Sequence, residues 1–197
     1  MALSLVTAPA TEPVSVAEAK LQCRVDYSDE DVLLMDLVTS GREWVEAFVH
    51  RALITQTWDL TLDAFPCDSD DPVWLPLPPL QSVTHVKYYD TTGTLQTWSS
   101  SLYTVVAPSG PMARMGYVVP AYQQIYPTTR AVPDAVTVRF VCGYGTDSVD
   151  VPASLRQAIK MRVLDLWETG RASTVVGNIV SAVPNTLNAL LWPYKAF

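Results

Sequence analysis

The sequence predicts an α+β protein, with N-terminal helices and a C-terminal helix packed with a small antiparallel β-sheet region. Helical periodicity is confined to the ranges 15–50 and 152–169, and alternating strand-like patterns fill 52–145. Helices and strands that are segregated along the chain favour α+β over alternating βαβ units. We therefore expect a single domain over residues 1–170 and an extended C-terminal arm over 171–197.

The N-terminal part begins with an expected extended arm, residues 1–14, which is punctuated by prolines. Ser15 and Glu18 have the spacing of a capping box, in which the Ser hydroxyl accepts from the N3 amide and the Glu reaches back. This pattern predicts a short helix that ends at about Arg24.

A second helix is expected from Ser28, as N-cap, to about His50. The acids that follow Ser28 suit the positive end of a helix dipole. Apolar residues recur with helical spacing and form one stripe, which consists of Leu34, Leu37, Val38, Val45 and Phe48. This stripe predicts the face that packs on the core.

Alternation of period two starts after residue 51, where Trp58, Leu60 and Leu62 interleave with polar residues. A proline-rich loop over 65–79 interrupts the strands. The turn at 90–93 ends in glycine and predicts a hairpin. The remaining expected strands are 83–89, 94–98, 103–106, 115–119 and 135–141.

The last helix is expected to start after Pro152, which suits a first helical turn, and to end near Gly170. Its apolar stripe consists of Leu155, Ile159, Val163 and Leu166. The arm that follows contains Gly177, Pro184 and Pro193, so it cannot form one continuous helix. Within it we expect a short helix over 185–191.

The charge of the chain argues against nucleic-acid recognition. It carries 13 basic and 20 acidic residues, a net charge of −7, and no basic run that could follow a phosphate backbone. This charge is compatible with a protein that DNA passes without specific binding. No apolar stretch is long enough for a membrane span, and the N-terminus lacks the features of a secretory signal. These features favour a soluble, intracellular type of chain.

Motifs for catalysis, cofactors or metals are missing from the sequence. The three cysteines have no CxxC spacing, and His50 and His85 are not placed as a metal pair. The acids Asp68, Asp70 and Asp71 lack the glycine and glutamate of an EF-hand, so a solvated loop is favoured over a cation site. We expect no enzyme activity, no cofactor and no metal.

Aromatic residues are many and charges are few, which is typical of proteins with large interfaces and favours multimerisation. Trp44, Phe48 and Trp167 are the candidate subunit-interface residues. The apolar tail is a candidate docking arm, carried by Leu190, Leu191, Trp192, Tyr194 and Phe197. The alternative interpretation is a tail that folds back on its own domain.

The order of several short motifs resembles the head–tail connector (adaptor) family of tailed bacteriophages, including the adaptors of gene transfer agents. The N-terminal motifs are VSVAEAK at 14–20, RVD at 24–26, DED at 29–31, REWVEA at 42–47 and RALITQTW at 51–58. The later motifs are LP at 75–76, PLQSV at 79–83, VKYYD at 86–90, VTVRF at 136–140, GYG at 143–145, VP at 151–152, AI at 158–159, LL at 190–191 and PY at 193–194.

This resemblance implies a structural protein that forms a ring, commonly of twelve copies, beneath the portal of a DNA-filled capsid. Such a ring extends the DNA channel and presents a platform for the stopper or tail protein. Asp68, Asp70 and Asp71 are then candidate acids of the channel lumen. The alternatives are a stopper or tail-terminator ring, a virion-associated hydrolase and a monomeric ligand-binding domain.

Overall fold

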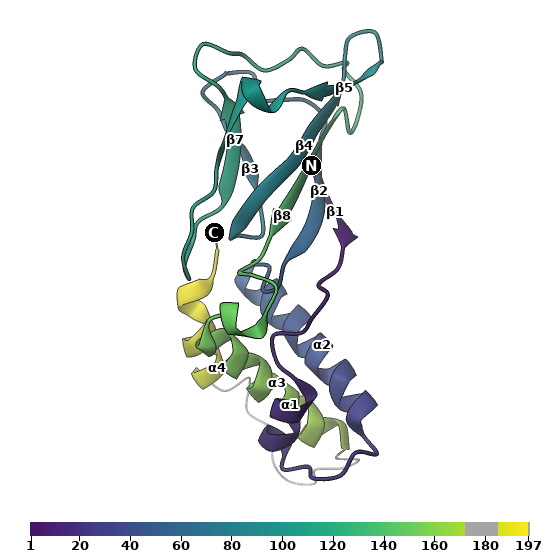
Figure 1. Cartoon of the computed structure of the whole chain (residues 1–197), viewed down its shortest axis with the longest axis vertical. Coiled ribbons are helices and arrows are strands. Elements are labelled where there is room, and N and C mark those ends of the chain that lie inside the picture. The colour runs from purple at the N-terminus through teal and green to yellow at the C-terminus, as the bar shows by residue number, and fades with distance from the viewer. Residues whose placement is uncertain (172–184, 197) are drawn as a thin grey trace. The chain divides into compact units, whose positions relative to one another are not determined.

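The computed structural model describes residues 1–171 and 185–196, which form two compact units. The β unit comprises Met1–Pro9, Thr55–Tyr144 and Ala196, and the helical unit comprises Ala10–Ile54 and Gly145–Lys195. Helices and antiparallel strands are segregated between these units (Figure 1), so the predicted α+β class is confirmed. The predicted boundary between a domain and an arm near residue 170 stays a prediction, and 172–184 of that arm lie outside the described residues.

The β unit contains two antiparallel sheets. The five-stranded sheet has the order β1 (Ala2–Thr7), β2 (Gln56–Leu62), β8 (Val136–Cys142), β4 (Leu80–Tyr89) and β5 (Leu95–Trp98). The three-stranded sheet has the order β3 (Val73–Leu75), β7 (Gly116–Pro120) and β6 (Tyr103–Val106). The two sheets meet at Gly116, where an added Cβ would clash with the Leu80 side chain.

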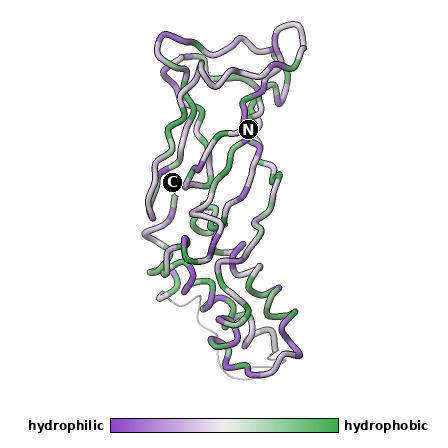
Figure 2. Tube along the Cα trace, in the orientation of Figure 1, coloured by the Kyte–Doolittle hydropathy of each residue, from purple (hydrophilic) through white to green (hydrophobic). Residues whose placement is uncertain are grey.

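The centre of the β unit is β8, which alternates strictly between buried and half-buried residues. Its inner face is Val136, Val138, Phe140 and Cys142, all at most 1% exposed. Val138 lies opposite both Leu60 of β2 and Val86 of β4, so the inner face is continuous across three strands. Figure 2 shows how hydrophobic and hydrophilic residues are distributed along the trace of the chain.

An aromatic cluster fixes the loops of the β unit to this sheet. Phe65 stacks on Tyr126 with a centroid distance of 5.1 Å and contacts Trp98 edge-on at 5.4 Å. The Tyr126 hydroxyl donates to the carbonyl of Asp71 at 2.7 Å, and burial raises the pKa of this phenol to about 12. The cluster therefore joins the loop after β2 to the segment after β7.

The helical unit consists of α1 (Val16–Cys23), α2 (Asp31–Val49), α3 (Ala153–Arg171) and α4 (Asn185–Leu191). The helices α1, α2 and α4 each contact α3. The helices α2 and α3 approach closely at Gly41, because a Cβ there would lie 3.4 Å from Ile159 and Val163. The core residues of the unit include Leu34, Val38, Val45, Val49, Leu155, Ile159, Val163, Trp167, Leu187 and Leu191.

The predicted helix boundaries hold with one correction. The capping box is confirmed, with Ser15 Oγ accepting from the Glu18 amide at 3.2 Å and Glu18 accepting from the Ser15 amide at 3.0 Å. The second helix has Glu30 as its N-cap, so the prediction of Ser28 is wrong. The Ser28 carbonyl instead closes a turn with the Asp31 amide at 3.2 Å, and the helix starts after that turn.

The C-terminal helices agree with the pattern. The third helix begins at Ala153, directly after Pro152, and reaches Arg171, one residue beyond the predicted end. The short helix expected over 185–191 is present as α4. Gly177 and Pro184 of the predicted arm, like Phe197, lie outside the described residues.

The strand predictions are confirmed for most of the β unit, and two corrections concern segments with little local signal. Residues 2–7 of the expected arm form β1, which pairs with β2 and has no buried residue. The proline-rich loop contains β3, which pairs with β7 in the second sheet. Both strands depend on a partner distant in sequence, so their own residues do not reveal them.

Replacement of Phe140 by Ala should lower the free energy of unfolding by about 3–5 kcal/mol, because a fully buried aromatic ring is lost from the central strand. Urea denaturation measures this effect. Val141→Ala on the other face of β8 is the control and should cost less, since Val141 is only half-buried. Equal losses for the two variants would contradict the assigned inner face.

Candidate assembly surface

The structure brings three of the predicted assembly residues together on the helical unit. Trp44 and Phe48 lie one turn apart on α2 and stack with a centroid distance of 5.5 Å and an interplanar angle of 20°. The Lys195 ammonium lies 5.4 Å from the centre of the Phe48 ring and 5.6 Å from that of Trp192. The end of the tail is thereby joined to α2.

A second cation completes this arrangement. The Arg162 guanidinium of α3 lies 5.3 Å from the centre of the Trp44 ring, a distance at which the ring face attracts a cation. Arg162 also pairs with Asp165 at 2.5 Å. We call the set Trp44, Phe48, Arg162, Trp192 and Lys195 the aromatic–cation surface.

The tail residues differ in how available they are. Leu191 is fully buried in the helical unit, and Leu190 and Tyr194 are half-buried. Trp192 is 62% exposed and is the tail aromatic that a partner could contact most directly. The Arg51 guanidinium, buried at the end of α2, donates to the Tyr194 carbonyl and holds this turn in place.

Trp167 is more deeply buried than the aromatic residues of this surface. It is 7% exposed and belongs to the core of the helical unit. Its predicted role at a subunit interface is therefore not supported by exposure, whereas Trp44 and Phe48 remain half-buried at the surface.

A buried ion network holds α2 on the side away from Trp44 and Phe48, since residues two apart lie about 200° apart around a helix. The Arg42 side chain is only 8% exposed, and it donates to Glu12 at 2.8 Å and to Glu46 at 2.7 Å. Burial opposes the charge of Arg42, but both carboxylates outweigh it and raise the pKa of the guanidinium. Glu46 also accepts from the Leu53 amide at 2.8 Å, so one carboxylate joins the middle of α2 to the segment after it.

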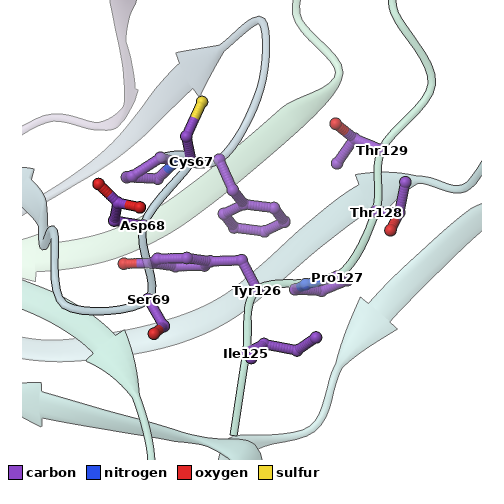
Figure 3. Close-up of a pocket in the computed structure, with 10 residues that line it drawn as sticks. Cys67, Asp68, Ser69, Ile125, Tyr126, Pro127, Thr128 and Thr129 are labelled. Atoms are coloured by element: carbon purple, nitrogen blue, oxygen red, sulfur yellow. The ribbon is translucent and has the colours of Figure 1, made fainter.

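The candidate lumen acids lie in the β unit, in the loop between β2 and β3, where Asp68, Asp70 and Asp71 are all exposed. Asp68 lies on the rim of a groove of about 450 Å³, between the ranges 65–69 and 125–129 (Figure 3). In this view Tyr126 lies between the Asp68–Ser69 segment and Pro127.

Within residues 1–171 and 185–196, no three His, Cys, Asp or Glu side chains are grouped in a way that could hold a metal ion. The acids 68, 70 and 71 therefore do not converge on a cation site. His50 ends α2 as its C-cap, and His85 lies on β4 opposite Arg139. Burial and the charges of Lys87 and Arg139 lower the pKa of His85. No helix in the described ranges is long and apolar enough to cross a membrane.

Two residues of the aromatic–cation surface, Arg162 and Lys195, were not predicted from the sequence. Both are basic side chains next to apolar helical or tail patterns, where a solvated cation is the usual outcome. Their role emerges only when α3 and the tail meet α2.

Residues 13–104 match the family described as phage gp6-like head-tail connector protein. The resemblance to head–tail connectors is confirmed. The matched range contains α1, α2 with Trp44 and Phe48, and the strands β2 to β5. The match supports a structural connector role. No curated protein matches the sequence.

Solved structures of gene transfer agent (GTA) particles contain chains with the same fold. A chain in the virion of a native GTA particle and one in the neck of an empty GTA particle, computed with C6 symmetry, each align with a TM-score of 0.79 and 22% identity. A chain in the neck of a native GTA particle, computed with C12 symmetry, aligns with a TM-score of 0.76 and 21% identity. Each alignment covers 100% of this chain and 96% of the other.

Removal of the Glu46 carboxylate should destabilise the helical unit strongly. Glu46→Ala leaves Arg42 buried with one carboxylate fewer and should cost about 3–5 kcal/mol of unfolding free energy. Glu43→Ala is the control, because Glu43 is 67% exposed and its 3.7 Å contact with Arg42 is the longest of the three. Chemical denaturation compares them, and similar losses for both variants would contradict the stabilising role of the buried network.

Proposed function

We propose that this chain is a non-enzymatic head–tail connector that forms a ring beneath the portal of a phage or phage-like particle. The ring would extend the DNA channel and provide the platform on which the stopper or tail attaches. The observation that carries the proposal is the match of residues 13–104 to the gp6-like head-tail connector family.

Ring formation, with twelve copies as the proposed number, is supported by the symmetry of the neck structures that contain similar chains. Trp44 and Phe48 are the proposed packing residues between neighbouring copies, because they are aromatic and only half-buried. Trp167 is a core residue, so in this proposal it would support the packing helices without contacting a neighbouring copy.

The portal is the proposed partner of the tail, through Leu190, Leu191, Trp192, Tyr194 and Phe197. Leu191 is buried, so it would anchor the tail to its own unit while Trp192 contacts the portal. This division of roles is supported by the Lys195 contact, which holds Trp192 beside α2 in the free protomer.

Genomic DNA is proposed to pass through the ring without specific binding. Exposed carboxylates at Asp68, Asp70 and Asp71 would keep phosphates from adhering if this loop faces the channel. The proposed location is the neck of the particle, after assembly in the bacterial cytoplasm. No cofactor or metal takes part in this role.

The test is attachment of the purified chain to tail-less capsids that carry a portal, followed by electron microscopy of the neck. A ring at the portal supports the connector role. Attachment only to capsids that already hold a connector would instead favour a stopper or tail-terminator. Loss of an enzymatic activity on replacement of His50 or His85 by Ala, with attachment intact, would favour a hydrolase.

Replacement of Trp192 by Ala should weaken capsid attachment about 30-fold, because a central interface tryptophan contributes about 2 kcal/mol or more. The folded state should persist, since this side chain is mostly exposed. Trp74→Ala is the matched control, because Trp74 is 50% exposed in the β unit. Co-sedimentation with capsids measures the effect, and unchanged attachment of Trp192→Ala contradicts the docking role of the tail.

A further inference from the structure

The corner between α1 and α2 exposes an unusual number of large apolar side chains. Leu21 and Val32 are 81% and 73% exposed, and three further residues are between 44% and 52% exposed. The five are Leu21, Tyr27, Val32, Leu33 and Met35. Since they all fall within 21–35, they form a local patch of the kind that marks an interaction site.

Exposed acids outnumber exposed bases in this part of the chain, where Arg24 is the exposed base. Asp26, Asp29 and Asp36 are exposed, and none of them has an ion-pair partner within the described ranges. The neighbouring Asp31 differs, because it is paired with Lys20 at 2.7 Å. We call the five apolar residues and these three acids the acidic–apolar corner.

The aromatic–cation surface of the same unit carries two cations, of which Arg162 is already paired with Asp165. Its two cations, Arg162 and Lys195, lie over the rings of Trp44 and Phe48, while Trp192 is left for the proposed portal contact. An acidic apolar surface and a basic aromatic surface complement each other in charge and can bury apolar area together.

The two surfaces occupy opposite ends of α2. Val32 lies in its first turn and Trp44 more than three turns later, a separation of about 18 Å at 1.5 Å per residue. The two surfaces of one copy are therefore too far apart along α2 to contact each other. When each copy gives one surface to one neighbour and the other surface to another, the contact is heterologous and generates rings or open filaments. Two copies that pair both surfaces with each other would form a two-fold dimer, so the proposed ring requires the heterologous arrangement.

We propose that the acidic–apolar corner of one copy docks on the aromatic–cation surface of a second copy. The inference deepens the proposed ring and rests on it. It assigns Asp29 and Asp36 to one side of the subunit contact and Arg162 and Lys195 to the other.

Charge reversal on each side provides the test. An acid-reversed variant carries Asp29→Lys and Asp36→Lys, and a base-reversed variant carries Arg162→Glu and Lys195→Glu. Each variant alone brings like charges together in every contact, so its self-association should weaken at least tenfold. A mixture of the two restores attraction in every contact and should associate again, in strict alternation.

Sedimentation velocity of the full chain, from micromolar to millimolar concentration, measures this association. Wild-type association, loss in both variants and recovery in the mixture support the proposal. A wild-type chain that remains monomeric throughout, variants that associate like the wild type, or a mixture that fails to recover would each overturn it. Lys195→Glu alone is the second basic variant, because it leaves the Arg162–Asp165 pair intact.

Asp36→Lys and Asp134→Lys form a matched pair, since both replace an exposed acid and change the net charge equally. Only Asp36→Lys should weaken association, whereas equal weakening by both would point to net charge rather than this surface. Attachment of each variant to portal-bearing capsids is recorded separately. A wild-type chain that attaches to capsids but never self-associates overturns the docking proposal and leaves the connector role standing. A wild-type chain that does not attach overturns the connector role itself.

Discussion

The buried charge of Arg42 is the constraint on which the helical unit depends. A guanidinium this far from water is stable only while Glu12 and Glu46 remain beside it. This requirement holds the segment before α1 against the middle of α2, and the Leu53 amide ties the chain after α2 to the same carboxylate. Trp44 and Phe48 lie about 200° around α2 from Glu46, so the network holds the side of the helix opposite the aromatic rings.

The tail depends on this arrangement in turn. Leu187 and Leu191 bury against the helices, and the Arg51 contact with the Tyr194 carbonyl fixes the turn after α4. Lys195 then lies between Phe48 and Trp192. A cation between two aromatic rings is attracted by both ring faces, and one ring alone would attract it less. The tail is therefore both a part of the core and a source of exposed aromatic surface.

The sequence predicts what depends on local interactions. The capping box of Ser15 and Glu18, the hairpin at Gly93 and the alternation of β8 each involve neighbouring residues, and each is present. The strand β1 and the Lys195 contact could not be predicted, because each depends on a partner far away in the chain. The predicted N-cap of α2, Ser28, was wrong because its carbonyl closes a turn with the Asp31 amide. The helix starts after this turn, with Glu30 as its N-cap.

Net charge poses a problem for any assembly of identical copies of this chain, since each carries −7 and repels the others. Screening confines that repulsion to roughly 8–10 Å at physiological ionic strength, so only charges close to the contact decide whether copies associate. In the proposed contact, exposed acids of one copy would face Arg162 and Lys195 of the next and would offset the repulsion locally. Such a contact would let an acidic protein bind its own copies without a continuous basic surface that would retain DNA.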